Sequence, residues 1–132
     1  MDYIVNDIEN ILLLNKLGVF ELIISKCSSM SITNIRINDF SFNKQREINL
    51  LKEKGLKEVE TSLELYNYNG FSRKSINELG DGDLSSLYQA KETGSTIITN
   101  NFLIYNTAVG LSIDCIYVFD FCKLFIENEN EM

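Results

Sequence analysis

The sequence of 132 residues is 45% hydrophobic and carries a formal net charge of −7, which predicts one folded domain over residues 1–132 rather than a disordered chain. The acidic excess argues against tight non-specific nucleic-acid binding, because counterion release requires many basic side chains. The chain contains no histidine, which excludes Ser-His-Asp triads and histidine-ligated metal sites.

Strand-like and helix-like segments alternate along the chain. The first half predicts strands at 3–5, 30–33 and 56–62, helices at 11–17, 19–27 and 43–55, and a helical turn at 34–40. The second half predicts helix and loop at 62–78, helices at 83–94, 102–109 and 120–128, and strands at 95–99 and 113–119. In the amphipathic helix 43–55, Ile48, Leu50 and Leu51 are expected to point inward. Such alternation predicts a largely parallel sheet covered by helices.

The cysteines and the apolar runs bear on location. Cys27, Cys115 and Cys122 form an odd, widely spaced set without a CxxC motif, which is typical of reduced, buried thiols in a cytoplasmic protein. Apolar runs such as Ile11–Leu14 are far too short to span a bilayer. The N-terminus has neither a basic region nor a small-residue cleavage site, so we expect no signal peptide and no membrane association.

Polar residues stand at four strand–helix junctions, namely Asp7, Asp39, Asp83 and the pair Asn100 and Asn101. The carboxyl ends of parallel strands meet at one edge of a sheet, so we expect the three aspartate carboxylates within about 8 Å of each other. Three crowded carboxylates repel one another unless a cation neutralises them. Mg²⁺ or Mn²⁺ would do so through oxygen ligands and retained waters, and could activate a water for phosphodiester hydrolysis.

Each of these residues also has a purely structural interpretation. Asp7 and Asp83 could each cap a helix, and Asp39 could be a solvated turn residue. The "GDGD" loop has acidic residues at the spacing of a calcium loop, but its sixth position is Ser86 instead of glycine and a helical pattern runs through it. We therefore reject an EF-hand.

A basic segment allows two interpretations as well. It could contact a phosphate backbone or form an ordinary solvated helix face. Its members are Lys44, Arg46, Lys52, Lys54 and Lys57.

Four stretches, in order along nearly the whole chain, resemble the motifs of the PIN-domain family. They are "NDIENILLLNKLGVFELI", "ITNIRINDF", "LGDGDLSSLYQAKETGSTIITNN" and "IDCIYVFDFCKLFIEN". The chain is most similar in kind to the small bacterial PIN ribonucleases that serve as toxins of toxin–antitoxin pairs. This resemblance implies a PIN-like α/β fold, a three-layer sandwich with a mostly parallel central sheet flanked by helices. It also places Asp7, Asp39 and Asp83 at three acidic positions, the second of which is usually a glutamate.

The chain departs from the family pattern at a fourth position. Where the family commonly has another aspartate, this chain has Asn101, with Asn100 beside it. An asparagine can coordinate Mg²⁺ weakly through its carbonyl oxygen but brings no charge, and Glu9 or Asp120 could restore the missing one. Some members of the toxin branch carry "TNN" here, so the change alone does not exclude activity.

The resemblance implies two alternative functions. The first is a metal-dependent endoribonuclease acting on single-stranded or structured RNA, in which Asp7, Asp39 and Asp83 hold Mg²⁺ or Mn²⁺ and Asn101 positions water or phosphate. Its partners would be RNA, a small antitoxin protein and a second copy in a homodimer. The alternative is a catalytically weakened or inactive PIN-like module that binds RNA or a protein.

Overall fold

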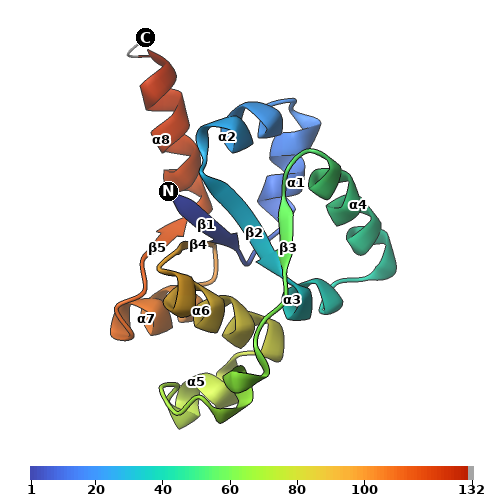
Figure 1. Cartoon of the computed structure of the whole chain (residues 1–132). Coiled ribbons are helices and arrows are strands. Elements are labelled where there is room, and N and C mark those ends of the chain that lie inside the picture. The colour runs from blue at the N-terminus through green and yellow to red at the C-terminus, as the bar shows by residue number, and fades with distance from the viewer. Residues whose placement is uncertain (131–132) are drawn as a thin grey trace.

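Five parallel strands form one sheet at the centre of the molecule. The structure is a computed structural model that describes residues 1–130, with side chains described for residues 1–125. The strand order is β3-β2-β1-β4-β5, and every neighbouring pair is parallel (Figure 1). The strands are β1 (Asp2–Val5), β2 (Ser29–Thr33), β3 (Lys57–Val59), β4 (Thr96–Thr99) and β5 (Cys115–Tyr117). The predicted parallel α/β sheet is confirmed.

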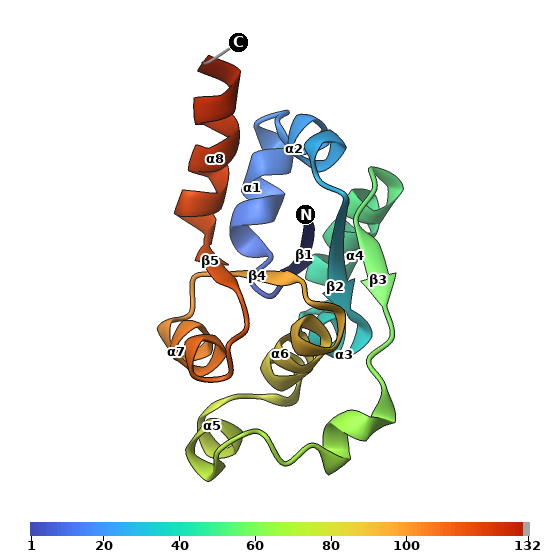
Figure 2. The same ribbon diagram turned by 60° about the vertical axis from the view of Figure 1, so that its left-hand side comes forward.

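Helices connect the strands and cover both faces of the sheet. The first four are α1 (Glu9–Lys16), α2 (Phe20–Lys26), α3 (Asn34–Asn38) and α4 (Phe42–Glu53). The 3-10 helix η1 (Leu63–Asn67) is followed by α5 (Arg73–Glu78), α6 (Asp81–Thr93), α7 (Phe102–Gly110) and α8 (Val118–Asn130). Figure 2 shows α1, α2, α4 and α8 on one side of the sheet, and α6 and α7 on the other. Among the described residues, no helix is both long and apolar enough to cross a membrane.

The sheet separates two apolar clusters. Along β1, Tyr3 and Val5 join a cluster that contains Phe121 of α8, whereas Ile4 joins a second cluster that contains Leu87 of α6. Successive strand residues point to opposite faces, so a strand buried on both faces carries a continuous apolar run. This accounts for the uninterrupted "YIV" of β1 and gives the molecule its three layers.

Three residues of α4 were predicted to point inward, and for Leu50 this prediction is wrong. Ile48 and Leu51 are fully buried, but the side chain of Leu50 is 54% exposed. Leu50 is two positions from Ile48, and helix residues two apart point in widely different directions. The apolar stripe of α4 therefore runs through Ile48 and Leu51 only.

The order of the strands determines where a crevice can form. The chain builds outward from β1 through β2 to β3, and then crosses to the other side of β1 to form β4 and β5. In open parallel sheets, ligands bind at the carboxyl ends of the strands, beside the point where the direction of winding reverses. Here that point lies between β1 and β4. Asp7 lies two residues beyond the end of β1, and Asn100 directly follows β4.

Candidate functional site at the carboxyl edge of the sheet

Asp7 joins the ends of the two central strands. It lies two residues beyond β1, and its Oδ2 accepts hydrogen bonds from the Thr99 hydroxyl and from the backbone N–H of Asn100. The N-cap residue of α1 is Ile8, and no side chain caps that helix. The interpretation of Asp7 as a helix cap is therefore wrong. Its carboxylate holds the end of β1 against the end of β4.

Asp83 belongs both to a helix start and to the sheet edge. It is the third residue of α6, and its Oδ2 accepts a hydrogen bond of 3.3 Å from the backbone N–H of Gly80, the N-cap residue. Its Oδ1 accepts a hydrogen bond of 3.1 Å from the side-chain amide of Asn6, whose own carbonyl oxygen accepts from the Ser86 hydroxyl at 2.8 Å. The α6 helix continues unbroken through this segment, which is incompatible with a calcium loop.

Asp39 is the most exposed of the three aspartates. It is the C-cap residue of α3, and its side chain is 38% exposed. The start of α6 packs closely against it, because an added Cβ on Gly82 would overlap the Asp39 carboxylate and lie 3.0 Å from the Cα of Arg36. A glycine at this position is therefore what allows α6 to approach α3 so closely.

The three aspartates converge on one guanidinium group, that of Arg36 in α3. Nη1 of Arg36 lies 3.2 Å from Asp39 Oδ2 and 3.6 Å from Asp83 Oδ1, and Nη2 lies 3.7 Å from Asp7 Oδ1. Asp39 Oδ2 and Asp83 Oδ1 both contact Nη1, so these two oxygens cannot be farther apart than the sum of their distances to that nitrogen. The cluster thus combines three negative charges with one positive charge at the carboxyl edge of the sheet.

Arg36 was not among the site residues predicted from the sequence. It is the only basic residue between Lys26 and Lys44, and it lies one turn after β2, since α3 begins directly at Asn34. The resemblance to the PIN family implies an acidic residue about one turn after this strand. Asp39, three residues after Arg36, was therefore given that place. The one signal in the sequence that could have identified Arg36 is that it is the single basic residue of the stretch "ITNIRINDF".

The two asparagines organise the backbone beside the cluster. The side-chain oxygen of Asn101 accepts hydrogen bonds from the backbone N–H groups of Leu103 at 2.8 Å and Ile104 at 3.4 Å, and thereby caps α7. The side-chain oxygen of Asn100 accepts from the backbone N–H of Val118 at 3.3 Å, at the start of α8. Both amide oxygens are thus engaged in fixing helix starts, which asparagine does as well as aspartate.

Most of the other charged candidates pair within the chain. Glu9 forms an ion pair of 2.7 Å with Lys44, and Lys52 forms one of 2.8 Å with Glu58. Lys54 donates to the side-chain oxygen of Asn15. These pairs favour the solvated helix face over a phosphate-binding surface for the basic segment. Asp120 lies exposed in the first turn of α8.

The cysteines do not supply a thiolate ligand or nucleophile. Cys27, Cys115 and Cys122 are free and half-buried. Burial raises the pKa of the Cys115 thiol to about 12, and burial likewise raises the pKa of the other two. Because the thiolate is the reactive and metal-binding form, these groups are neutral and inert near pH 7.

The acidic cluster as arranged does not fit a divalent ion. Mg²⁺ needs oxygen ligands at about 2.0–2.1 Å in near-octahedral geometry, whereas the Arg36 guanidinium occupies the position between the carboxylates. Within the part of the chain that the structure describes, no group of three or more His, Cys, Asp or Glu side chains is arranged to hold a metal ion. A divalent ion beside Arg36 would also be repelled by its charge.

Comparisons with known proteins give the fold. No protein-family model and no curated protein matches the sequence. A PilT N-terminus (PIN) domain protein from the archaeon Sulfolobus solfataricus is similar with a TM-score of 0.61 at 14% identity, over 92% of this chain and 90% of that one. A chain of VapBC2 from Rickettsia felis, solved with a DNA fragment from their promoter, is similar with a TM-score of 0.58 at 18% identity, over 89% of this chain and 98% of that one. The predicted PIN-like fold is therefore confirmed.

Proposed function

We propose that this chain is a PIN-like module that binds a protein partner and does not cleave RNA through a metal ion. One observation carries the proposal. The polar groups at the carboxyl edge of the sheet are bonded within the chain itself, with Arg36 in contact with all three aspartates. A metal-dependent hydrolytic site needs an activated water and free ligand positions for the metal. The internal bonding of this cluster supports a structural role instead.

An apolar groove beside the cluster supports a protein as the partner. The groove lies between α1 and α8 and has a volume of about 250 Å³. It is lined by Asn10, Leu13, Leu14, Asn100, Val118, Phe119 and Cys122. Asn100 connects the groove to the cluster, because its backbone N–H donates to Asp7. An open apolar groove of this kind can accept apolar side chains of a partner segment.

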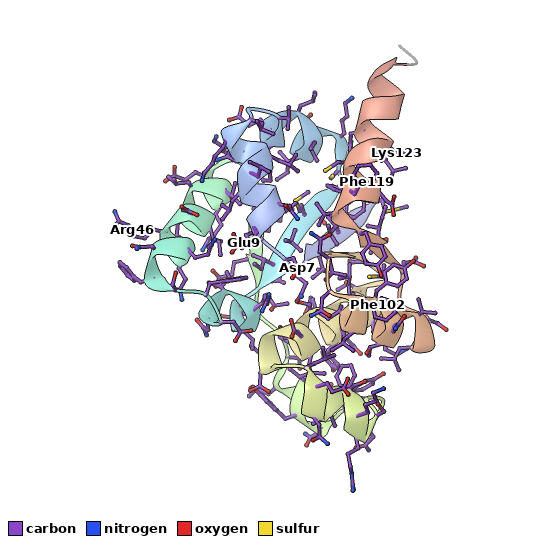
Figure 3. All side chains as sticks on the ribbon, turned by 180° about the vertical axis from the view of Figure 1, so that it is seen from behind. Asp7, Glu9, Arg46, Phe102, Phe119 and Lys123 are labelled. Atoms are coloured by element: carbon purple, nitrogen blue, oxygen red, sulfur yellow. The ribbon has the colours of Figure 1, made fainter. Side chains whose placement is uncertain are left out.

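Two exposed aromatic rings lie on the side of the molecule that carries this groove, and one of them, Phe119, lines it. The side chain of Phe119 is 77% exposed and that of Phe102 is 65% exposed, and Figure 3 shows both rings on the side of the molecule from which Asp7 is seen. Aromatic residues are enriched at protein interfaces, so these rings are suited to contact a partner seated at the groove.

The partner that suits this surface is a segment with apolar side chains and basic ones. The chain carries a net charge of −7, and the cluster at the end of the groove retains more negative than positive charge. Such a segment is expected of a small antitoxin protein, and the likeness in fold to VapBC2 supports that kind of partner. The net charge disfavours RNA as the partner.

A metal-dependent ribonuclease is the second candidate. One observation favours it, namely that Asp7, Asp39 and Asp83 reach the same place from three separate elements. Cleavage by this route would require the Arg36 guanidinium to leave the space between the carboxylates.

A cleavage assay separates the two candidates. A fluorogenic single-stranded RNA is incubated with the parent protein and with Asp7→Ala while Mg²⁺ and Mn²⁺ are titrated. We expect no cleavage above background from either protein at any metal concentration. Metal-dependent cleavage by the parent that Asp7→Ala abolishes would overturn the proposal and establish the nuclease.

The partner is tested separately: the DNA next to this gene is searched for a short reading frame, and the product of such a frame is assayed for binding to this protein. We expect it to bind the parent protein, and we expect Phe119→Ser to weaken that binding at least about tenfold, as a central interface aromatic does. Phe42→Ser is the matched control, because Phe42 is 74% exposed on α4 and does not line the groove. Equal binding by the parent and by Phe119→Ser would contradict a partner seated in this groove.

A further inference from the structure

We propose that Arg36 is a permanent internal counter-ion, which takes the place of a divalent metal ion in the acidic cluster and excludes that ion. The inference rests on the proposed function, since a cluster neutralised in this way does not hold a catalytic metal. It assigns to Arg36 a role that the sequence alone did not suggest. The consequence is a latent cation site that removal of one side chain would open.

Arg36 is held in position from several directions. Its Nε donates a hydrogen bond of 2.6 Å to the backbone oxygen of Asn6, just beyond β1. Its guanidinium lies over the ring of Phe40, with the central carbon 4.6 Å from the ring centroid. Its side chain is only 16% exposed. A guanidinium with a fixed backbone partner and a stacked ring is part of the folded structure, unlike a long surface side chain that samples many rotamers.

The carboxylates are arranged around this cation. The planar guanidinium has several donors, so one group can contact Asp7, Asp39 and Asp83 at once, which a lysine ammonium cannot reproduce in the same geometry. Asp7 and Asp83 also accept hydrogen bonds from neutral donors, including the Thr99 hydroxyl and the Asn6 amide. Partly buried charges are stable when they are both paired and hydrogen-bonded in this manner.

Arg36 and a metal ion therefore compete for the same carboxylates. A divalent ion would need Asp7 and Asp83 oxygens as ligands, and these are two of the groups that Arg36 neutralises. Binding of the ion would require Arg36 to give up its contacts with the aspartates and the backbone of Asn6. The ion binds only to molecules in which Arg36 has left the carboxylates. The observed affinity for the ion is therefore the intrinsic affinity multiplied by the small fraction of molecules in that state.

The experiment compares four proteins. Thermal unfolding is followed in EDTA and in increasing MnCl₂, and free Mn²⁺ is measured by electron paramagnetic resonance. The proteins are the parent, Arg36→Gln, Arg36→Lys and Arg46→Gln. Arg46 is the matched control, because it is exposed on the outer side of α4 (Figure 3) and contacts only the Phe42 ring among the described interactions that involve its guanidinium.

The expected results follow from the competition. The parent and Arg46→Gln should show no Mn²⁺-dependent change in melting temperature and no saturable Mn²⁺ binding. Arg36→Gln should melt at least about 5 °C lower in EDTA, because three carboxylates lose their counter-ion. Mn²⁺ should restore its stability, with an affinity at least about tenfold above that of the parent. Arg36→Lys should fall between the parent and Arg36→Gln in both respects.

Several outcomes would overturn the inference. Saturable binding of Mn²⁺ by the parent that Asp83→Asn abolishes would show that Arg36 does not exclude the ion. An Arg36→Gln protein that is as stable as Arg46→Gln in EDTA would show that Arg36 is not a needed counter-ion. If Arg36→Gln is unfolded in EDTA, Mn²⁺ during refolding should recover its native circular dichroism, and no recovery would count against the inference.

The two proposals fail separately. A parent protein that binds Mn²⁺ at the cluster but does not cleave RNA would overturn the counter-ion inference and leave the binding module intact. Equal partner binding by the parent and by Phe119→Ser, in a parent protein that binds no Mn²⁺, would overturn the binding module seated in this groove and leave the counter-ion inference intact.

Discussion

The acidic cluster at the sheet edge and the lysines of α4 differ in how their charges are paired and buried. At the sheet edge, Arg36 serves three aspartates, in a place where the arginine side chain is only 16% exposed. On α4, Lys44 and Lys52 each meet one carboxylate near the surface, at 2.7 and 2.8 Å. The shorter distances belong to the surface pairs, yet surface pairs contribute little because water solvates both partners.

This comparison teaches that the number of partners and the degree of burial outweigh the length of a single contact. Removal of a shared, partly buried cation leaves several carboxylates without a counter-ion, whereas removal of a surface lysine leaves one carboxylate that water solvates.

Reversal of the central charge should have the largest effect. Arg36→Glu would place a fourth carboxylate against the three aspartates, and we expect it to destabilise the protein by about 3 kcal/mol or more. The measurement is urea unfolding in EDTA, with Lys44→Glu as the matched reversal on α4. We expect Lys44→Glu to cost about 1 kcal/mol at most. Equal losses from the two reversals would remove the distinction between the two regions.

A steric change at the cluster should have the next largest effect. In Gly82→Ala the new methyl group would overlap the Asp39 carboxylate and crowd the backbone of Arg36, so α6 and α3 must move apart. We expect a loss of about 1–3 kcal/mol, which is the usual cost of overpacking. Gly110→Ala is a suitable control, because an added Cβ there meets nothing within 4 Å. If both variants unfold at the same urea concentration, the close approach of α6 to α3 is not what positions the cluster.

The role of the uncharged Asn101, which lies at the carboxyl edge of the sheet, can be tested by substitution. Asn101→Ala removes the cap of α7 and should cost about 1 kcal/mol, whereas Asn101→Asp keeps a capping oxygen and should cost less. Thermal unfolding of the two variants gives the comparison. A larger loss in Asn101→Asp than in Asn101→Ala would mean that repulsion from the aspartates dominates over capping at this position.

The smallest effect is expected at the surface pairs. Lys52→Gln removes the ion pair with Glu58 and should change the free energy of unfolding by less than about 0.5 kcal/mol. Addition of 0.5 M NaCl should abolish that small difference, because exposed charges are screened by salt. A loss comparable to that of Gly82→Ala would show that α4 contributes to stability in the same way as the cluster.

Much of the fold could be predicted from the sequence, because the signals there are local. The β-branched run of β4, the apolar stripe through Ile48 and Leu51, and the glycine that ends α6 at Gly94 all act over a few residues. The position of Asp7 at the carboxyl edge followed from the alternation of strands and helices, because the carboxyl ends of parallel strands lie together. Asp83 follows α5 and not a strand, so its place at the same edge was implied by the resemblance to the PIN family.

The partners of those side chains could not be predicted in the same way. That Arg36 meets Asp83 depends on how α3 packs on α6, which is a contact between residues 47 positions apart in the sequence. The role of Asn101 as a cap was obscured because aspartate and asparagine suit both a cap and a metal site. The exposure of Leu50 depended on the orientation of α4, which two adjacent leucines leave undecided.

We propose that Arg36 stands where a divalent ion would otherwise bind. X-ray diffraction from crystals of the parent protein grown in MnCl₂, with anomalous data collected for manganese, would show which cation lies between the carboxylates. We expect the Arg36 guanidinium between Asp7, Asp39 and Asp83, and no anomalous peak among these carboxylates. A manganese peak bound by Asp7 and Asp83, with Arg36 turned away from them, would contradict it.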